Sequence, residues 1–173
     1  ATLDEVLRLI VRRGQLMQAL PAGGAMAAVM TDATRLAPLL AADPRLSLAA
    51  DNGPKMATLS GPKAAVEMAC ATLDAQGIVS RRLAVSHAFH SSLLEPMLDD
   101  LEQAAKMVEW QTPRLPVIGN LTGEKIECFD PGYWRRHSRQ PVAFAAGIRQ
   151  LAVLGCAVFL EVGPQPILME LGR

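Results

Sequence analysis

The first 20 residues carry apolar side chains at the spacing of one helix face. The members of this stripe are Leu3, Val6, Leu7, Ile10, Met17 and Leu20. Thr2 and Glu5 have the spacing of a capping box, which predicts a helix start at that point. Arg13 falls inside the stripe, whereas Arg12 lies about 100° away from it. The pattern therefore predicts an amphipathic helix over residues 3–20 with one arginine facing inward.

Short strand-like and helix-like segments alternate between residues 24 and 86. The pattern predicts strands at residues 25–30, 46–50, 55–60 and 80–85 and helices near residues 36–40 and 62–77. Asn52-Gly53 is typical of a hairpin turn, and Gly77 of a helix end. Pro38 conflicts with the interior of the first helix, because it lacks a backbone N–H. The order βαββαβ is that of a ferredoxin-like unit.

Longer helices alternate with single strands in the rest of the chain. We expect a helix over residues 92–108, begun by a capping box of Ser92 and Glu95. The later segments are a strand at 116–119, helices at 133–137 and 142–154, a buried strand at 157–162, a turn at 161–164 and the start of another helix. Strands that alternate with helices favour a parallel α/β layer.

The composition narrows the choice of partners. The chain balances 17 Lys and Arg against 17 Asp and Glu, and 50% of its residues are hydrophobic. Without a net positive charge or a basic stripe, neither nucleic acid nor a membrane surface is expected as a partner. No apolar run reaches the roughly 18 residues of a membrane span, and the start has no basic leader with a cleavage site. These features favour a cytoplasmic protein.

The cysteine and histidine patterns give little support to a metal site. The three cysteines lie far apart and outside any C-x-x-C pair: Cys70, Cys128 and Cys156. This spacing argues against a disulfide framework and a cysteine zinc site. His87 and His90, with His137 as a third ligand, would suit zinc, but histidine pairs three residues apart are common by chance. We therefore expect no bound metal.

Arg13 and His90 are the candidates for chemistry. An arginine facing inward either forms a structural ion pair or binds the carboxylate of a ligand through its two-pronged guanidinium. His90 is either a hydrogen-bonded loop histidine or a general base, kept neutral by the positive end of the helix that follows. No G-x-S-x-G sequence supplies a nucleophile, and Ser92 is better explained as a helix cap with Ser91 as its neighbour.

Four strings of the sequence resemble, in order and spacing, the acyltransferase domain of a modular type I polyketide synthase. They are VRRGQLMQ (11–18), GAMAAV (24–29), VSHAFHS (85–91) and EVGP (161–164). The resemblance runs from the first residue to the last and extends to malonyl-CoA:acyl carrier protein transacylases. It implies an α/β fold, in which part of an α/β-hydrolase-like large subdomain (residues 1–23 and 87–173) holds an inserted ferredoxin-like small subdomain (residues 24–86).

The resemblance also implies an activity and a set of site residues. A malonyl group would pass from malonyl-CoA to a serine, and then to the phosphopantetheine thiol of an acyl carrier protein. His90 matches the family's catalytic base, and Arg13 matches the arginine that binds the malonyl carboxylate. His137 matches the residue whose backbone carbonyl orients the base. His87 and Phe89 belong to a tetrad typical of malonyl selection, in which Phe89 fills the space of an α-methyl group.

The family's serine elbow and the Gly-Gln segment of its oxyanion hole have no counterpart in these 173 residues. We therefore expect the C-terminal half of a catalytic domain, with no bound cofactor and no activity on its own. Its expected partners are malonyl-CoA, an acyl carrier protein and other polyketide synthase domains such as a ketosynthase. The alternatives are a non-catalytic module that docks onto a carrier protein and a decayed remnant of an enzyme.

Overall fold

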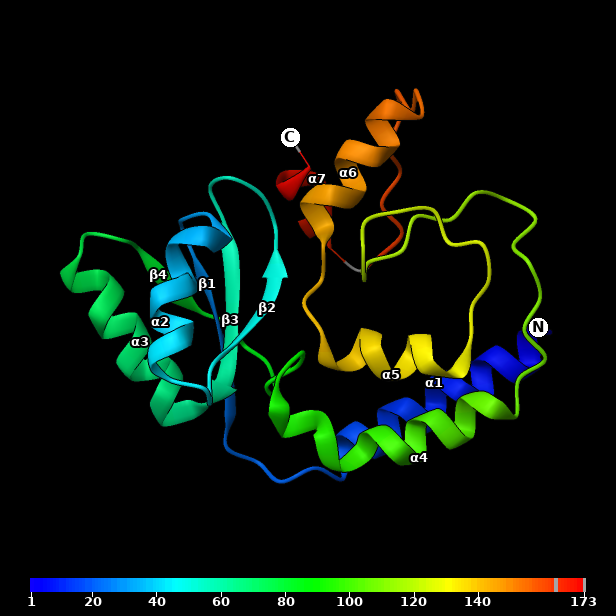
Figure 1. The fold of residues 1–173 in the computed structure, drawn as a ribbon, viewed down its shortest axis with the longest axis horizontal. Coiled ribbons are helices and arrows are strands. Elements are labelled where there is room, and N and C mark those ends of the chain that lie inside the picture. Colours follow the sequence, from blue (N-terminus) through cyan, green and yellow to red (C-terminus); the bar gives the residue numbers. More distant parts are fainter. Residues whose placement is uncertain (164, 173) are drawn as a thin grey trace.

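A computed structural model describes residues 1–163 and 165–172 of the chain. Figure 1 shows a small sheet with its helices on one side of the molecule and the other helices beside it. The sheet part contains β1 (Gly24–Val29), the 3-10 turn η1 (Ala33–Leu36), α2 (Ala37–Ala42), β2 (Ser47–Asp51), β3 (Ala57–Pro62), α3 (Lys63–Ala75) and β4 (Ser80–Arg82). The other elements are α1 (Leu3–Gln18), the 3-10 turn η2 (Ser92–Leu94), α4 (Glu95–Lys106), α5 (Pro131–Arg139), α6 (Phe144–Val153) and α7 (Ile167–Leu171).

The four strands form one antiparallel sheet in the order β2-β3-β1-β4. The βαββαβ order expected from the sequence is therefore confirmed. One face of the sheet packs against α2 and α3, and its buried core includes Val29, Leu59, Val66 and Leu73. Pro38 lies in the first turn of α2, where a missing N–H removes no helical hydrogen bond.

The hairpin between β2 and β3 is longer than the two-residue turn that Asn52-Gly53 predicts. The N–H of Asn52 donates to the carbonyl of Met56 at 3.1 Å, so the loop spans residues 52–56. Gly53 has a φ of +133°, which favours glycine. The carboxylate of Asp51 accepts a hydrogen bond from the N–H of Gly53 at 3.1 Å. This local turn at Asp51 replaces the tight turn.

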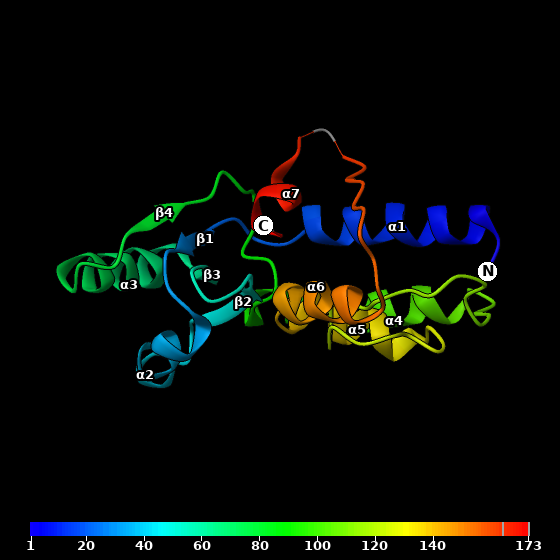
Figure 2. The ribbon, with the colours of Figure 1, turned by 90° about the horizontal axis from the view of Figure 1, so that it is seen from above.

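Helices α1, α4 and α5 form a second packed group, in which α4 contacts both α1 and α5. Figure 2 shows this group beside the sheet part in the turned view as well. The predicted capping box of Thr2 and Glu5 is present at the start of α1. The buried apolar residues of α1 are Leu9 and Leu16, because they face α4. The predicted stripe is wrong at three positions, which are exposed: Leu3, Leu7 and Ile10.

The start of α4 is capped differently from the prediction. Ser91 is the N-cap of η2, and its hydroxyl accepts a hydrogen bond from the N–H of Leu93 at 3.3 Å. The residue that precedes α4 is Leu94, which provides no side-chain cap. The predicted capping box of Ser92 and Glu95 is wrong, because Ser92 already lies inside η2.

Residues 157–162 are extended but form no strand. A strand needs a backbone partner beside it, and no described residue pairs with this segment. Its side chains are strongly exposed, with 88% for Val158 and 86% for Leu160. The buried strand predicted here is therefore wrong in this structure. The strand predicted at 116–119 is reduced to a single bridge between Ile118 and Lys125.

Two further features of the described residues concern the environment of the chain. Within residues 1–163 and 165–172, no helix is long and apolar enough to cross a membrane. Cys70, Cys128 and Cys156 are free thiols, and two of them are exposed.

Gly24 allows the start of β1 to pack directly on the segment that leads to His90. A Cβ at this position would lie 2.5 Å from the backbone nitrogen of Ala88. We predict that Gly24→Ala lowers the free energy of unfolding by about 1–3 kcal/mol, because the backbone must move to accept the methyl group. Urea unfolding followed by circular dichroism measures the change. Gly14→Ala is the control, since a Cβ there meets nothing within 4 Å; equal losses in both variants would contradict the prediction.

Candidate active site

A tight turn before η2 presents His90. Its φ is +58°, a left-handed conformation that residues other than glycine rarely adopt and that is enriched at functional sites. Ser91 holds the turn, because its buried hydroxyl donates a hydrogen bond to the carbonyl of Ala88 at 2.6 Å. The backbone of this turn therefore helps to determine where the imidazole of His90 points.

The ring of His90 is held by a carbonyl that follows α5. Its Nδ1 lies 2.9 Å from the carbonyl oxygen of Gln140. Since a carbonyl only accepts, Nδ1 carries the proton of the neutral ring and Nε2 keeps a lone pair. The neighbouring segment is fixed by β2: the N–H of Val142 donates to the carbonyl of Ala49 at 2.8 Å, and the N–H of Asp51 donates to the carbonyl of Val142 at 2.9 Å. The small sheet thus helps to orient the candidate base.

The predicted partner of this ring was the backbone carbonyl of His137. In the structure the 2.9 Å hydrogen bond belongs to Gln140, three residues later. The backbone of His137 makes a smaller contribution in the same direction to the pKa of His90. His137 also brings its ring close to that of His90, with centroids 6.0 Å apart and planes at 88°. The site therefore contains two facing imidazoles.

Arg13 projects from α1 towards the two histidines. Its positive charge lowers the pKa of both His90 and His137, which places the guanidinium near both rings. Arg13 is half-buried, forms no ion pair with any described carboxylate, and has a buried Nε without a hydrogen-bond partner. Arg12, by contrast, is exposed and lies 3.7 Å from the carboxylate of Asp100. The structural ion pair considered for Arg13 is therefore not formed by the described residues.

Burial keeps both imidazoles neutral near pH 7. It is the main cause that lowers the pKa of His90; the carbonyl of Gln140 acts in the opposite direction, and Arg13 lowers the pKa further. Burial, Arg13 and His90 together lower the pKa of His137 to about 4. A neutral His90 with a lone pair on Nε2 meets the chemical requirement for a general base.

His87 and Phe89 lie apart from this cluster. His87 is 8% exposed, with Nδ1 3.0 Å from the hydroxyl of Ser86 and Nε2 3.3 Å from the carbonyl of Leu20. Because both ring nitrogens have protein partners, His87 supports the turn. Phe89 is half-buried against the core that α1 and α4 share. The substrate contacts expected of these two residues stay predictions.

The three histidines do not converge on one point. Within residues 1–163 and 165–172, no group of three or more His, Cys, Asp or Glu side chains could hold a metal ion. His90 and His137 face each other, but the ring nitrogens of His87 are engaged elsewhere.

An aromatic cluster beside the histidines was not predicted. Tyr133 stacks on His137, with centroids 5.6 Å apart and planes at 14°. Trp134 stacks on Trp110 at 5.8 Å, and Phe129 lies 5.1 Å from Tyr133. Both tryptophans and the single tyrosine thus gather here, although only 4% of the chain is aromatic. The spacing of Phe129, Tyr133 and Trp134 along the chain is the sequence signal for this cluster.

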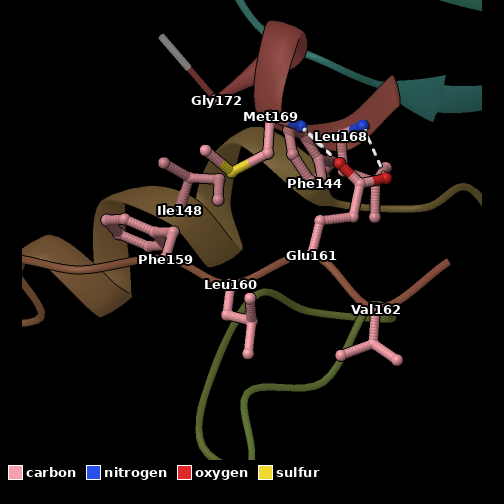
Figure 3. Close-up of a pocket in the computed structure, with 9 residues that line it drawn as sticks. All are labelled: Phe144, Ile148, Phe159, Leu160, Glu161, Val162, Leu168, Met169 and Gly172. Atoms are coloured by element: carbon pink, nitrogen blue, oxygen red, sulfur yellow. Dashed lines mark hydrogen bonds between the residues drawn. The ribbon is translucent and has the colours of Figure 1, made fainter. Parts of the chain in front are cut away.

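A cavity of about 350 Å³ lies between α6, α7 and the extended segment that precedes α7 (Figure 3). Its lining is mainly apolar and includes Phe144 and Met169. The carboxylate of Glu161 accepts hydrogen bonds from the N–H groups of Leu168 at 3.1 Å and Met169 at 2.9 Å, and so caps α7. The lining residues include no histidine, cysteine or serine, so we place the chemistry at His90. Pro164, the last residue of the EVGP string, lies outside the described residues.

A neutral histidine held by a carbonyl, with an arginine nearby, is a candidate site for acid–base chemistry. The acyl transferase domain family matches residues 1–173. The chain belongs to this family.

Its relatives confirm the resemblance to polyketide synthase domains. The chain is 45% identical over 168 residues to the phenolphthiocerol synthesis polyketide synthase type I Pks15/1 of Mycobacterium marinum, covering 94% of this chain and 8% of that protein. The acyltransferase domain from the second module of the salinomycin polyketide synthase is 45% identical, with a TM-score of 0.95 over 99% of this chain and 41% of that one. The SpnD acyl transferase domain, in complex with 2-(pent-4-yn-1-yl)malonyl, is 34% identical. Its TM-score is 0.89, and the match covers 98% of this chain and 41% of that one. The chain thus spans about two fifths of these solved domains.

We predict that the free energy of unfolding falls as the pH drops from 6.5 towards 4. The pKa of His90 is lowered in the folded chain, and that of His137 is lowered from 6.5 to about 4. The unfolded chain therefore binds protons in this window that the folded chain does not, whereas well above pH 6.5 both states are neutral at these rings. Urea unfolding at a series of pH values measures the slope.

His137→Phe is the control for this pH dependence, because it removes one of the two groups and keeps an aromatic ring. Its slope between pH 6.5 and 4 should be shallower than that of the wild type. Parallel slopes would show that His137 has an ordinary pKa and would contradict the prediction.

Proposed function

We propose that this chain is part of an acyltransferase domain that moves a malonyl extender unit from malonyl-CoA to the phosphopantetheine thiol of an acyl carrier protein. The observation that carries the proposal is the half-buried guanidinium of Arg13, which faces His90 and has no carboxylate partner among the described residues. An unpaired buried charge is costly, and the carboxylate of a substrate offsets that cost on binding. The complex of the SpnD domain with 2-(pent-4-yn-1-yl)malonyl supports a malonyl-type acyl group.

The attacking serine comes from outside these 173 residues, which contain no G-x-S-x-G sequence. His90 accepts the proton of that hydroxyl at Nε2 while the serine oxygen bonds to the thioester carbon. The carbon–sulfur bond then breaks, His90 returns the proton to the leaving thiol of CoA, and an acyl-serine remains. Attack by the thiol of the carrier protein breaks the ester, and the serine recovers its proton through His90.

Arg13 gives this exchange its selectivity for acyl groups that end in a carboxylate. Two parallel N–H···O bonds from a guanidinium fix both the position and the plane of a carboxylate. The thioester carbonyl of a malonyl group lies one carbon from that carboxylate. Anchoring the carboxylate near His90 therefore also positions the reacting carbon.

The finer architecture is part of the same proposal. We infer that residues 24–86 are a ferredoxin-like small subdomain inserted in an α/β-hydrolase-like large subdomain, to which residues 1–23 and 87–173 belong. The exposed apolar side chains of Val158, Phe159 and Leu160 support this, because an exposed apolar patch is typical of a surface that packs against further residues. Residues from outside these 173 would then cover this patch. The proposed acyltransferase domain would also have other domains of a polyketide synthase as partners, such as a ketosynthase.

A non-catalytic module that docks onto a carrier protein explains fewer of these features. Docking needs a complementary surface, but it needs neither the left-handed backbone of His90 nor an unpaired arginine beside it. Those two features are costly for folding and useful for acyl transfer, which favours the enzymatic role.

We predict that Arg13→Ala lowers kcat/KM for malonyl-CoA by roughly 10–100-fold in a complete acyltransferase domain that contains these residues, because a charge-assisted contact is lost. His90→Ala should lower kcat by about 10²–10⁴-fold, the usual contribution of a general base. Transfer of radiolabelled malonyl to a carrier protein measures both.

Arg12→Ala is the matched control for this experiment, since Arg12 adjoins Arg13 on α1 but is exposed and paired with Asp100. It should transfer malonyl at the wild-type rate. If Arg13→Ala does so too, the proposed recognition of the carboxylate is wrong.

We predict that Phe89→Ser increases the preference for methylmalonyl-CoA over malonyl-CoA by about 5–100-fold, because the smaller side chain leaves room for an α-methyl group. The ratio of the two kcat/KM values, measured with both substrates in competition, tests this. An unchanged ratio, with a melting temperature close to that of the wild type, would remove Phe89 from the selectivity-determining residues.

A further inference from the structure

Several buried polar atoms on α1 and α5 have no hydrogen-bond partner in the described structure. They are Nε of Arg13, Nε1 of Trp134, Nδ1 of His137 and Oγ of Ser138. The last three residues occur at i, i+3 and i+4 of α5, so they share one face of that helix. A buried polar group without a partner costs about 1–3 kcal/mol, and native proteins keep few of them. Such a cluster beside a candidate base points to a ligand that satisfies some of these atoms.

His137 is the member of this cluster that faces the site. Its ring lies edge-on to the ring of His90, with centroids 6.0 Å apart. The charge of Arg13 acts on it as well. Tyr133 stacks on the ring at 5.6 Å, and Trp134 contacts its edge at 6.4 Å, so aromatic packing fixes the orientation of the imidazole. The plane of the imidazole is therefore fixed beside His90, and its buried Nδ1 has no partner among the described residues.

The chemistry of His137 suits a neutral hydrogen-bond donor. Its pKa of about 4 means that the ring carries no charge near pH 7. A neutral donor can hydrogen-bond to an anion without adding a second positive charge to the site. A second positive charge would disfavour proton uptake by His90. Arg13 then provides the positive charge that attracts the carboxylate, and a hydrogen bond from His137 orients the carboxylate.

We propose that His137 donates a hydrogen bond from Nδ1–H to the acyl carboxylate held by Arg13, and is thereby a second determinant of selectivity for carboxylated acyl groups. This inference rests on the proposed function, because it assumes that a malonyl carboxylate reaches Arg13. The side chain of His137 would thus bind the substrate, whereas the resemblance implies only that its backbone carbonyl orients the base.

Nuclear magnetic resonance of the 173-residue chain tests the contact directly, since the chain has only three histidines. With ¹⁵N-labelled histidine, malonyl-N-acetylcysteamine should shift the Nδ1 resonance of His137. Acetyl-N-acetylcysteamine, which lacks the carboxylate, should leave it in place. A malonyl-dependent shift at His90 alone would overturn the inference.

Two substitutions separate the hydrogen bond from the packing of the ring. His137→Asn places a polar side-chain atom close to the Nδ1 position but loses the stacking on Tyr133. His137→Phe keeps the stacking but has no donor. We expect the malonyl thioester to bind His137→Asn within about 3-fold of the wild type and His137→Phe roughly 10-fold more weakly. The opposite order would show that the ring acts only through packing and would overturn the inference.

The variant Arg13→Ala distinguishes failure of this inference from failure of the proposed function. If Arg13→Ala weakens malonyl binding while His137→Phe does not, only the role of His137 is wrong. If neither variant changes binding, the proposed recognition of a carboxylate fails as well. Should both His137 variants fold poorly, the resonance of Nδ1 in the wild type still decides the question.

Discussion

The hydrogen bond between Nδ1 of His90 and the carbonyl of Gln140 is the interaction on which the site depends. It joins segments 50 residues apart, fixes the proton on Nδ1 and leaves Nε2 free for acid–base chemistry. Two further contacts support its ends: the side-chain hydroxyl of Ser91 donates to the carbonyl of Ala88, and the backbone of Val142 pairs with β2. The orientation of the imidazole therefore depends on the turn at Ser91 and on how β2 holds the segment that follows α5.

The electrostatics of the site follow from this placement. Arg13 and two imidazoles share a partly buried space in which the described residues provide no carboxylate partner for the arginine. Because burial penalises charge and the guanidinium is already positive, His90 and His137 release their protons at a lower pH than exposed histidines do. A ligand carboxylate at Arg13 would reduce that repulsion, so occupation of the arginine and proton affinity of the base are linked.

Part of the molecule has apolar surface that the described residues do not cover. Leu7 on α1 and Val158 and Leu160 in the extended segment are exposed, although their sequence patterns are those of buried elements. The chain spans only 41% of the salinomycin synthase domain and 41% of the SpnD domain. A helix face acquires its burial from its neighbours, and exposed apolar side chains of this kind are typical of an interaction surface.

The sequence by itself determined the features whose causes are local: the capping box of Thr2 and Glu5, the βαββαβ order, and the register that turns Arg13 and not Arg12 inward. It also carried the resemblance to acyltransferase domains. Only the tertiary structure decided that α1 buries Leu9 and Leu16, that Gln140 holds the imidazole, and that the ring of His137 faces it. These outcomes depend on the packing of segments that lie dozens of residues apart, and hydrophobic periodicity reports only which face of an element is apolar, not which neighbour covers it.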